Sequence, residues 1–533
     1  MREPVDVLII GAGASAAAFA WSMADTRMRI VCLEQGGWPD HTSYPAHDRE
    51  WEGRDDFSSD PNVRRSLADY PVNNIDSDIS VANFNGVGGG TVLFAGHFPR
   101  FHPSDFKVRT LDGVADDWPI DYELLEPYYQ LNDKMMGVSG LSGDPAYPEK
   151  LRTLPPIPLG RSGSTMAGGF NSLGWHWWPS DCAILTEERD GRAACINLGL
   201  CGLGCAQGAK GSVDVTYWPI AIRAGVEIVT DARVREIEVN DKGLATGAVY
   251  YDANGEEQRI EAHMVVVACN GIGTPRLLLN SKSKLFPDGL ANSSGLVGKN
   301  LMFHPYAGVD GVFPEDLDGL DGPHKSIASH QFYETDTSRD FTRGFSFEMH
   351  RGFGAVSTAL IGLQTGAVSW GNDHHDSFRS MLNRTMSLIA ICEDLPEQSN
   401  QVTLDDTLTD SSGIPAAKIS YRLSSNSRDM IEFSIARAKE VLEAAGAAKI
   451  LRAYGPVEYA GWHHMGTARM GNDPETSVVN KWGRAHDVKN LFIIDGSVFV
   501  TSAAVNPTST IQAIALYIAD QIKERLADAS LFD

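Results

Sequence analysis

The chain begins with the pattern of a β–α–β unit. Residues 5–10 are an apolar, β-branched run of strand length, and residues 29–33 form a second apolar run. Between them, a turn of small residues at 11–16 leads into a stretch of Ala, Phe, Trp and Met that is compatible with a helix up to about residue 24. This order predicts two buried strands joined by a helix.

The turn before the helix has the small residues that a dinucleotide site needs. Gly11 permits a tight turn, Gly13 lets the backbone approach a pyrophosphate, and Ala16 lets the helix pack closely on its strand. The first helical residues, Ala14 and Ser15, then present the positive end of the helix to the phosphates. The turn therefore predicts a bound dinucleotide; a glycine-tolerant turn without a ligand is the alternative.

An acidic residue closes the second strand. Glu34 lies twenty-three residues after Gly11 and can accept hydrogen bonds from ribose hydroxyls. A carboxylate at this position favours an unphosphorylated ribose and so disfavours NADP. The pattern does not separate FAD from NAD.

A second Gly-rich loop follows at 85–91. Its members Gly88, Gly89, Gly90 and Thr91 leave few protruding side chains, so the backbone N–H groups can approach a phosphate or a flavin ring.

Two later apolar runs also end at glycine-containing turns. Residues 264–269 lead into a Leu-rich segment with Pro275 near its start, which predicts that a helix opens there. Residues 490–494 lead to Asp495 and Gly496 and read as another buried strand.

The middle of the chain has a different pattern. From residue 308 to about 453 it carries alternating, β-prone runs such as 345–350, and it ends in a run at helical spacing from 427 to about 447. This block predicts a sheet with helices behind it, placed over the cofactor. Candidate residues for the lining of a substrate pocket are His330, Phe332, Trp370 and Asn372.

Composition narrows the classes of partner. The 533 residues include 45 Lys and Arg against 69 Asp and Glu, a formal net charge of −24. Sequence-independent binding of nucleic acid, or of an anionic membrane surface, needs a cationic face and is not expected. Hydrophobic residues make up 43% and charged residues 21%, which is typical of a folded protein. No apolar run reaches the ~20 residues of a membrane-spanning helix.

Three of the seven cysteines lie within eleven residues. Cys195, Cys201 and Cys205 form a C-x5-C-x3-C pattern in a Gly-rich loop. Three thiolates on such a loop can hold an iron–sulfur cluster or, with a fourth ligand, zinc. The alternative is a loop with three unrelated cysteines.

Taken together, these segments resemble the glucose-methanol-choline (GMC) family of FAD-dependent oxidoreductases. The resemblance rests on GAGASA at 11–16, NGVGGGT at 85–91, GIGTPRLLLNS at 271–281, HHMGTARMG at 463–471 and NPTSTI at 506–511. These motifs stand in the family's order over essentially the whole chain. The resemblance implies FAD rather than NAD.

The resemblance also implies an α/β fold of two interleaved domains. A Rossmann-like FAD-binding domain is expected at 1–110, 190–305 and 455–533. A substrate domain, built on a mostly antiparallel sheet backed by helices, is expected at 111–189 and 306–454.

Site residues follow from the family's motifs. The His-x-x-Gly-Thr pattern falls on His463, and the active-site partner, His or Asn in the family, falls on Asn506. Val92, Leu93 and Phe94 stand where some members tether the flavin through a His, so the FAD is expected to be non-covalent. The other positions expected to contact the cofactor are Val234 on the adenine side, Asp495 and Gly496 at the flavin, and Pro507 and Thr508.

This pair of side chains suits the oxidation of an alcohol. A neutral imidazole at His463 can take the hydroxyl proton while the hydride moves to flavin N5. The carboxamide of Asn506 can hydrogen-bond to the substrate oxygen without competing for the proton.

Within the family, the chain looks most like the catalytic subunits of the FAD-dependent glucose, fructose and gluconate dehydrogenases. That resemblance implies a [3Fe–4S] cluster on Cys195, Cys201 and Cys205, a sugar, glycoside or polyol substrate, and electron transfer to a cytochrome or quinone. It also implies a small accessory subunit, and a cytoplasmic enzyme or one exported to the periplasm with that subunit. The alternatives are an oxidase that makes hydrogen peroxide and a non-redox lyase that keeps FAD.

Overall fold

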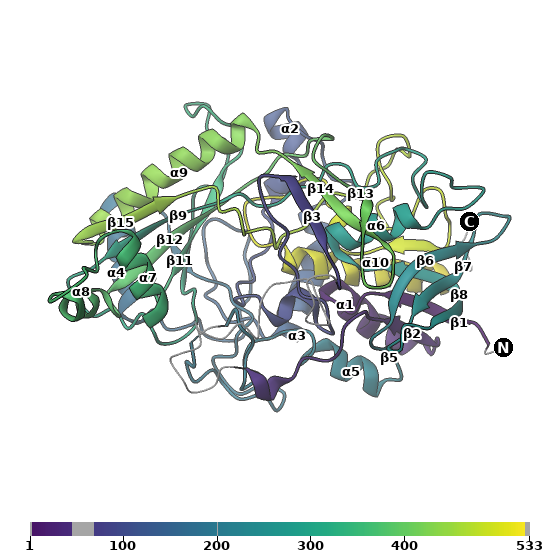
Figure 1. The fold of residues 1–533 in the computed structure, drawn as a ribbon, viewed down its shortest axis with the longest axis horizontal. Helices are drawn as coiled ribbons and strands as arrows, with labels where there is room; N and C mark the ends of the chain where they lie inside the picture. Colours follow the sequence, from purple (N-terminus) through teal and green to yellow (C-terminus); the bar gives the residue numbers. More distant parts are fainter. Residues whose placement is uncertain (1–2, 45–68, 200, 528–533) are drawn as a thin grey trace.

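The computed structural model describes residues 3–44, 69–199 and 201–527. Two large sheets stand at opposite ends of the molecule, with a small third sheet between them (Figure 1).

The first sheet contains the predicted β–α–β unit. Its strand order is β5-β2-β1-β8-β7-β6, with β16 also paired to β8. Strands β5, β2, β1, β8 and β16 are parallel to one another, whereas β6, β7 and β8 form an antiparallel meander. The bounds are β1 Val5–Ile10, β2 Ile30–Leu33, β5 Glu227–Val229, β6 Arg233–Val239, β7 Ala245–Tyr251, β8 Glu257–Val267 and β16 Leu491–Ile493.

Helices cover this parallel sheet. Helix α1 packs against α10 and α5, and α3 packs on α10. The four C-terminal residues of β8 are all buried, as is usual for parallel strands covered on both faces. The helices are α1 Ala14–Met23, α3 Tyr122–Met136, α5 Tyr217–Arg223, α6 Asn270–Asn280 and α10 Thr508–Ala527.

Helix α3 lies in the segment 111–189, which the sequence assigned to the substrate domain. Its residues Leu125, Tyr129 and Met136 are buried in the core of the first sheet, whereas β4 (Trp178–Pro179) from the same segment joins the second sheet. The domain boundaries stay a prediction.

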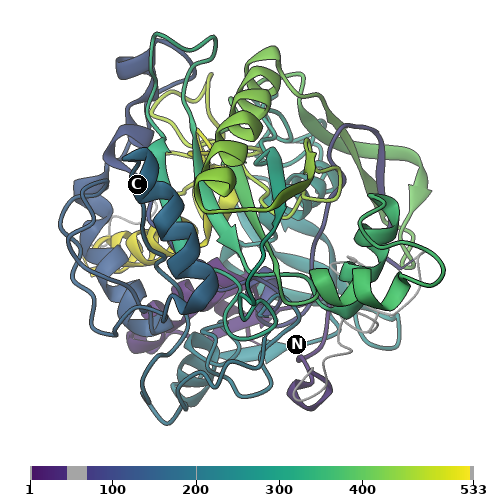
Figure 2. The ribbon, with the colours of Figure 1, turned by 90° about the vertical axis from the view of Figure 1, so that its left-hand side faces the viewer.

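The second sheet is antiparallel throughout, with the order β15-β9-β12-β11-β10-β4. Helices α4 (Gly160–Leu173) and α9 (Ser425–Ala444) pack together along it, as Figure 2 shows. The α/β fold with an antiparallel sheet backed by helices is therefore confirmed. The remaining strands of this sheet are β9 Tyr306–Val312, β10 Ile327–Phe332, β11 Phe345–His350, β12 Thr385–Cys392 and β15 Lys449–Tyr454.

The two faces of this sheet differ in chemistry. On β11, Phe345, Phe347 and Met349 belong to the apolar core beneath α9 and α4, while the alternating Ser346 and Glu348 are buried on the other face. The sheet therefore buries polar side chains on its second face.

A third, three-stranded sheet has the order β13-β14-β3, with β14 parallel to β3. Its strands are β3 Val72–Ser77, β13 Gln401–Thr409 and β14 Pro415–Tyr421; the other helices are α2 Val108–Asp112, α7 Ala355–Gln364 and α8 His374–Met381, with short 3₁₀ turns at Ala24–Thr26, His41–Ser43, Gly89–Val92, Pro103–Phe106 and Gly496–Val498.

Helix α6 differs from its prediction. It begins at Asn270, so Pro275 lies within it rather than at its opening. A proline has no N–H for the carbonyl four residues earlier. Here the carbonyl of Gly271 accepts a hydrogen bond from the Thr467 hydroxyl at 2.8 Å. This contact satisfies the carbonyl and joins α6 to the segment that carries His463.

Candidate functional site

A large cavity runs between the β1–α1 turn, the Gly-rich loop and the C-terminal segment. Its empty volume is about 1310 Å³, including the part open to solvent. The predicted site residues that line it are Gly11, Gly13, Ala14, Ser15, Glu34, Gly89, Gly90, Thr91, Val234, His463, Asp495, Gly496, Pro507 and Thr508. Ala16, Gly88 and Asn506 are not part of this lining, and their roles stay predictions.

The β1–α1 turn has the shape expected of a phosphate cradle. Gly11 has a φ of 95°, and an added Cβ would lie 2.5 Å from the carbonyl oxygen of Ala268. A Cβ on Gly13, in contrast, would meet only Gly89, at 4.0 Å. No side chain caps the N-terminus of α1, so its first N–H groups are open to an anion in the cavity. The turn fits a pyrophosphate.

Ala16 has a packing role. It is completely buried in the core between β1 and the helices, where a larger side chain would separate the helix from its strand.

The carboxylate of Glu34 supports the same turn. It accepts hydrogen bonds from the backbone N–H of Ala12 at 2.8 Å and of Gly36 at 2.9 Å. Burial raises the pKa of Glu34, although these backbone N–H groups oppose the rise. Its remaining lone pairs can accept from ribose hydroxyls in the cavity.

The Gly-rich loop lies against the β1–α1 turn. The N–H of Gly88 donates to the carbonyl of Ala12 at 2.9 Å. Gly88 has a φ of 106°, and a Cβ there would lie 2.7 Å from Val92. Gly88 thus shapes the loop, whereas Gly89 and Gly90 face the cavity.

Val234 lies on β6 beside the acidic end of the β–α–β unit. The N–H of Ala232 donates to the carbonyl of Glu34 at 2.9 Å, which brings the start of β6 next to the predicted ribose partner. Val234 and Gln35 both line the cavity there.

Asp495 follows β16, the strand of the first sheet that pairs with β8. It accepts from the Thr274 hydroxyl at 2.6 Å and from the N–H of Ser497 at 2.8 Å. A Cβ on Gly496 would lie 2.7 Å from the carbonyl oxygen of His464. This close approach fixes the backbone next to His463.

His463 is held by two aromatic partners. Its Nδ1 lies 2.8 Å from Nδ1 of His304 and 3.4 Å from the Tyr306 hydroxyl. Burial, together with His304 and Lys325, holds the pKa of His463 well below its usual value. The ring is therefore neutral.

The contacts of His304 determine which nitrogen of His463 carries the proton. Nε2 of His304 lies 3.1 Å and 2.9 Å from the carbonyl oxygens of Ser502 and Ala503, which can only accept. Burial lowers the pKa of His304 to about 4, so the ring is neutral and its proton is on Nε2. Its Nδ1 then accepts from Nδ1–H of His463. This leaves Nε2 of His463 with a free lone pair that can take a proton.

The neighbouring His464 has a structural contact. Its Nε2 donates to the carbonyl of Gly461 at 2.7 Å, and burial lowers its pKa to about 4.

Asn506 lies next to the cavity, before Pro507 and Thr508. Its Oδ1 is 2.8 Å from Nδ1 of His97, and its side chain is partly exposed.

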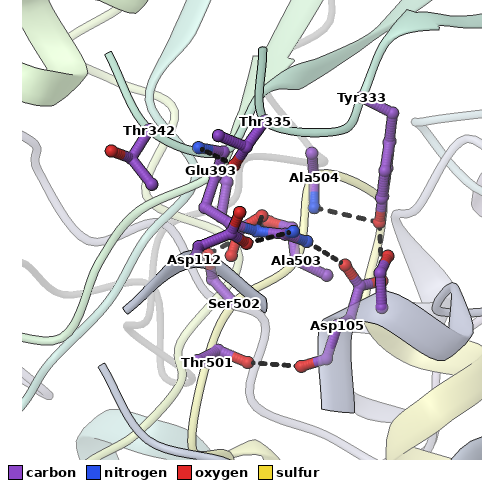
Figure 3. A network of polar contacts seen from close by, with 12 residues as sticks. Asp105, Asp112, Tyr333, Thr335, Thr342, Glu393, Thr501, Ser502, Ala503 and Ala504 are labelled. Atoms are coloured by element: carbon purple, nitrogen blue, oxygen red, sulfur yellow. Dashed lines mark hydrogen bonds and ion pairs between the residues drawn. The ribbon is translucent and has the colours of Figure 1, made fainter. Parts of the chain in front are cut away.

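The backbone before Asn506 is tied to the second sheet. The Tyr333 hydroxyl accepts from the N–H of Ala504 at 3.3 Å and donates to Asp105 at 2.7 Å (Figure 3). Arg343, which is buried, bridges Asp105 at 2.6 Å and Glu393 at 2.9 Å. A buried ionic network therefore positions the segment that carries Asn506.

The three clustered cysteines do not form a ligand set. In the described part of the chain, no group of three or more His, Cys, Asp or Glu side chains is placed to hold a metal ion. Cys195 and Cys205 accept from nearby backbone N–H groups instead, and burial raises the pKa of Cys201 to about 11. Because the three side chains are not grouped as ligands, the structure gives no support to the predicted iron–sulfur centre.

Sequence reasoning missed His304, Tyr306, His97 and Glu348. Each stands outside a recognisable motif, and only folding brings it to His463 or Asn506. Conversely, the candidate lining residues His330, Phe332, Trp370 and Asn372 do not line the cavity. Among the described residues, no helix is long and apolar enough to cross a membrane.

Comparison with known proteins agrees with this architecture. Family models described as GMC oxidoreductase match residues 169–306 and 396–515. The chain is 42% identical to 2-methyl-1,2-propanediol dehydrogenase of Mycolicibacterium austroafricanum over 99% of this chain and 96% of that protein. It is 28% identical to the fructose dehydrogenase large subunit of Gluconobacter japonicus over 97% of each.

A solved structure shows the same fold. The crystal structure of pyridoxine 4-oxidase from Mesorbium loti superposes with a TM-score of 0.67 at 17% identity, covering 98% of this chain and 99% of that one. With matched family models and a full-length relative that is an alcohol dehydrogenase, the chain belongs to the GMC oxidoreductase family, whose members use FAD.

Proposed function

We propose that the protein is an FAD-dependent dehydrogenase that oxidises a hydroxyl group of a small diol or polyol and passes the electrons to an acceptor other than O2. The observation that carries the proposal is the His463–His304 contact, which leaves a neutral imidazole with a free Nε2 beside the cavity. The full-length similarity to a diol dehydrogenase supports the substrate class.

The residues in and next to the cavity suit this reaction. FAD, when bound, supplies the hydride acceptor, and the β1–α1 turn, Glu34, Val234 and Asp495 are the residues that would hold it non-covalently. Nε2 of His463 takes the hydroxyl proton as a general base. The amide of Asn506 hydrogen-bonds to the hydroxyl oxygen and sets its orientation.

The 42% identical relative is a dehydrogenase, which supports a dehydrogenase over an oxidase. A basic small subunit, a cytochrome or a quinone is the proposed electron partner, and the net charge of −24 suits a cationic protein. The iron–sulfur cluster stays a prediction from the cysteine pattern alone, and assays of purified protein for iron and acid-labile sulfide will decide it.

The deciding experiment is anaerobic reduction of the flavin. Purified holoenzyme is mixed with 2-methyl-1,2-propanediol, 1,2-propanediol, glycerol, glucose, fructose and gluconate, and loss of the flavin absorbance is followed. The proposal expects rapid bleaching by at least one small diol or polyol. Bleaching by none of these compounds would refute it.

A second measurement identifies the acceptor. The reduced enzyme is exposed either to air-saturated buffer or to an artificial quinone. Reoxidation by the quinone with little hydrogen peroxide supports the dehydrogenase, whereas stoichiometric peroxide identifies an oxidase.

A further inference from the structure

His97 lies beside the Gly-rich loop, and the chemistry described above gives it no role. Its side chain is buried, with 4% of the residue exposed. Nδ1 of His97 contacts two acceptors at once, Oδ1 of Asn506 at 2.8 Å and Oε1 of Glu348. Glu348 is fully buried on β11, on the polar face of the second sheet.

The second oxygen of Glu348 is also occupied. Its Oε2 contacts Nζ of Lys325 and lies 3.5 Å from Nε2 of His350. Burial by itself raises the pKa of Glu348, but His97 and Lys325 outweigh burial and hold this pKa well below its usual value. Glu348 is therefore a carboxylate and can only accept hydrogen bonds.

The carboxylate fixes the orientation of the Asn506 amide. Since Glu348 only accepts, Nδ1 of His97 must carry a proton, which it shares with Oδ1 of Asn506. A flipped amide would set its NH2 group against this N–H. The NH2 group of Asn506 is therefore turned away from His97 and is free to donate.

We propose that His97 and Glu348 are positioning residues that hold Asn506 as a hydrogen-bond donor to the substrate oxygen. The inference rests on the proposed function, in which Asn506 binds that oxygen. It complements the role of His304: one buried histidine leaves His463 as a proton acceptor, and the other leaves Asn506 as a donor. A hydroxyl group needs both, because its proton must leave while its oxygen accepts.

Substitution of His97 tests the proposal through anaerobic flavin reduction with the best substrate. His97→Ala should lower the limiting rate by about ten- to hundredfold, which is less than the roughly 10²–10³-fold seen when a preorganised donor is itself removed, because the Asn506 amide remains but loses its fixed orientation. His97→Asn should recover most of the rate, because its amide N–H can replace Nδ1–H. His97→Gln places its amide farther out, near the position of Nε2, and should recover less. Equal rates for His97→Asn and His97→Gln would contradict the proposal.

A double substitution separates positioning from a structural effect. If His97 acts through Asn506, His97→Ala should slow the Asn506→Ala variant by less than about twofold, because the two effects are then non-additive. Fully additive losses overturn the proposal. Tyr147→Phe is the structural control, since its buried hydroxyl donates to the carbonyl of Arg100 and not to His97, Glu348 or Asn506; its rate should stay within about twofold of the wild-type rate.

Bound FAD and the thermal midpoint are measured for every variant. If His97→Ala does not retain FAD, the comparison of His97→Asn with His97→Gln decides. Failure of the proposed function is distinct, because then no alcohol reduces the flavin of the wild-type protein.

Discussion

At the scale of single residues, the site depends on which atoms are left without partners. Nδ1 of His463 is used by His304, so Nε2 remains for the substrate. The cavity face of the β1–α1 turn is open in the same way, because Gly13 has no side chain and a Cβ there would meet only Gly89. Both features leave room for ligand groups.

Two glycines of the same turn should respond differently to substitution. In Gly11→Ala the new Cβ would collide with the carbonyl of Ala268 at a positive φ, so we expect a loss of about 2–4 kcal/mol in the free energy of unfolding. Gly13→Ala has space and should fold normally but bind FAD more weakly. Urea unfolding and FAD titration of the apoprotein measure the two effects. Equal loss of stability in both variants would argue against this division.

The low pKa of His463 predicts the pH dependence of the reaction. Only the neutral ring accepts a proton, and burial holds its pKa well below the usual 6.5. The rate of flavin reduction should therefore stay constant as the pH falls from 8 through 6.5, and decrease only in more acidic buffer. His463→Asn should reduce the rate by about 10²–10⁴-fold. Stopped-flow measurement at several pH values tests both statements, and a rate that halves near pH 6.5 would contradict the first.

At the scale of elements, the segment 501–506 connects the two large sheets. Its carbonyls accept from His304, and the N–H of Ala504 donates to Tyr333. Ala503 has a φ of 58°, an uncommon conformation for a residue with a Cβ. The surrounding contacts therefore hold a backbone that is not intrinsically favoured.

Tyr333→Phe should weaken the contact between this segment and the second sheet. It removes one partner each from Asp105 and from the N–H of Ala504, so we expect a destabilisation of about 1–3 kcal/mol and slower flavin reduction. Tyr147→Phe is a matched control, because its buried hydroxyl donates to the carbonyl of Arg100 at 3.1 Å, away from Asn506. The control should lose stability but keep its rate of flavin reduction. Equal slowing in both variants would show that the lower rate comes from a general loss of stability and not from the contact between Tyr333 and Ala504.

At the scale of the whole molecule, buried carboxylates connect parts that are distant in sequence. Asp394, two residues after β12, accepts from the hydroxyl of Tyr421 on β14 at 2.7 Å and from the N–H of Phe303 at 3.2 Å. Burial raises the pKa of Asp394 to about 7. Asp394 therefore titrates near neutral pH.

The sign of this titration can be predicted. An Asp whose pKa is higher in the folded than in the unfolded state stabilises the fold when protonated, and the gain is lost as the pH rises through the folded pKa. Relative to Asp394→Asn, the wild-type protein should become more stable as the pH falls from 8 towards 4, by at most about 1.4 kcal/mol per pH unit. Thermal midpoints of both proteins at four pH values measure the difference; a constant difference would contradict the prediction.

The sequence by itself determined the features that depend on neighbouring residues. The β1–α1 turn, Glu34 and the apolar strands follow from local spacing, and the order of the motifs predicted the family and the antiparallel sheet. The physical reason is that turns, strands and phosphate cradles are built from a few consecutive residues. The start of α6 was misplaced because Thr467, far away in the chain, satisfies the carbonyl that Pro275 leaves free.

Only the tertiary structure decided how the proposed catalytic groups are protonated and oriented. His304 and His97 lie 159 residues from His463 and 409 residues from Asn506, respectively, and neither carries a signal in its own segment. It also showed that the three cysteines, close in sequence, do not converge as ligands. Proton positions and ligand sets depend on burial and on partners from several elements, which the spacing of residues along the chain does not encode.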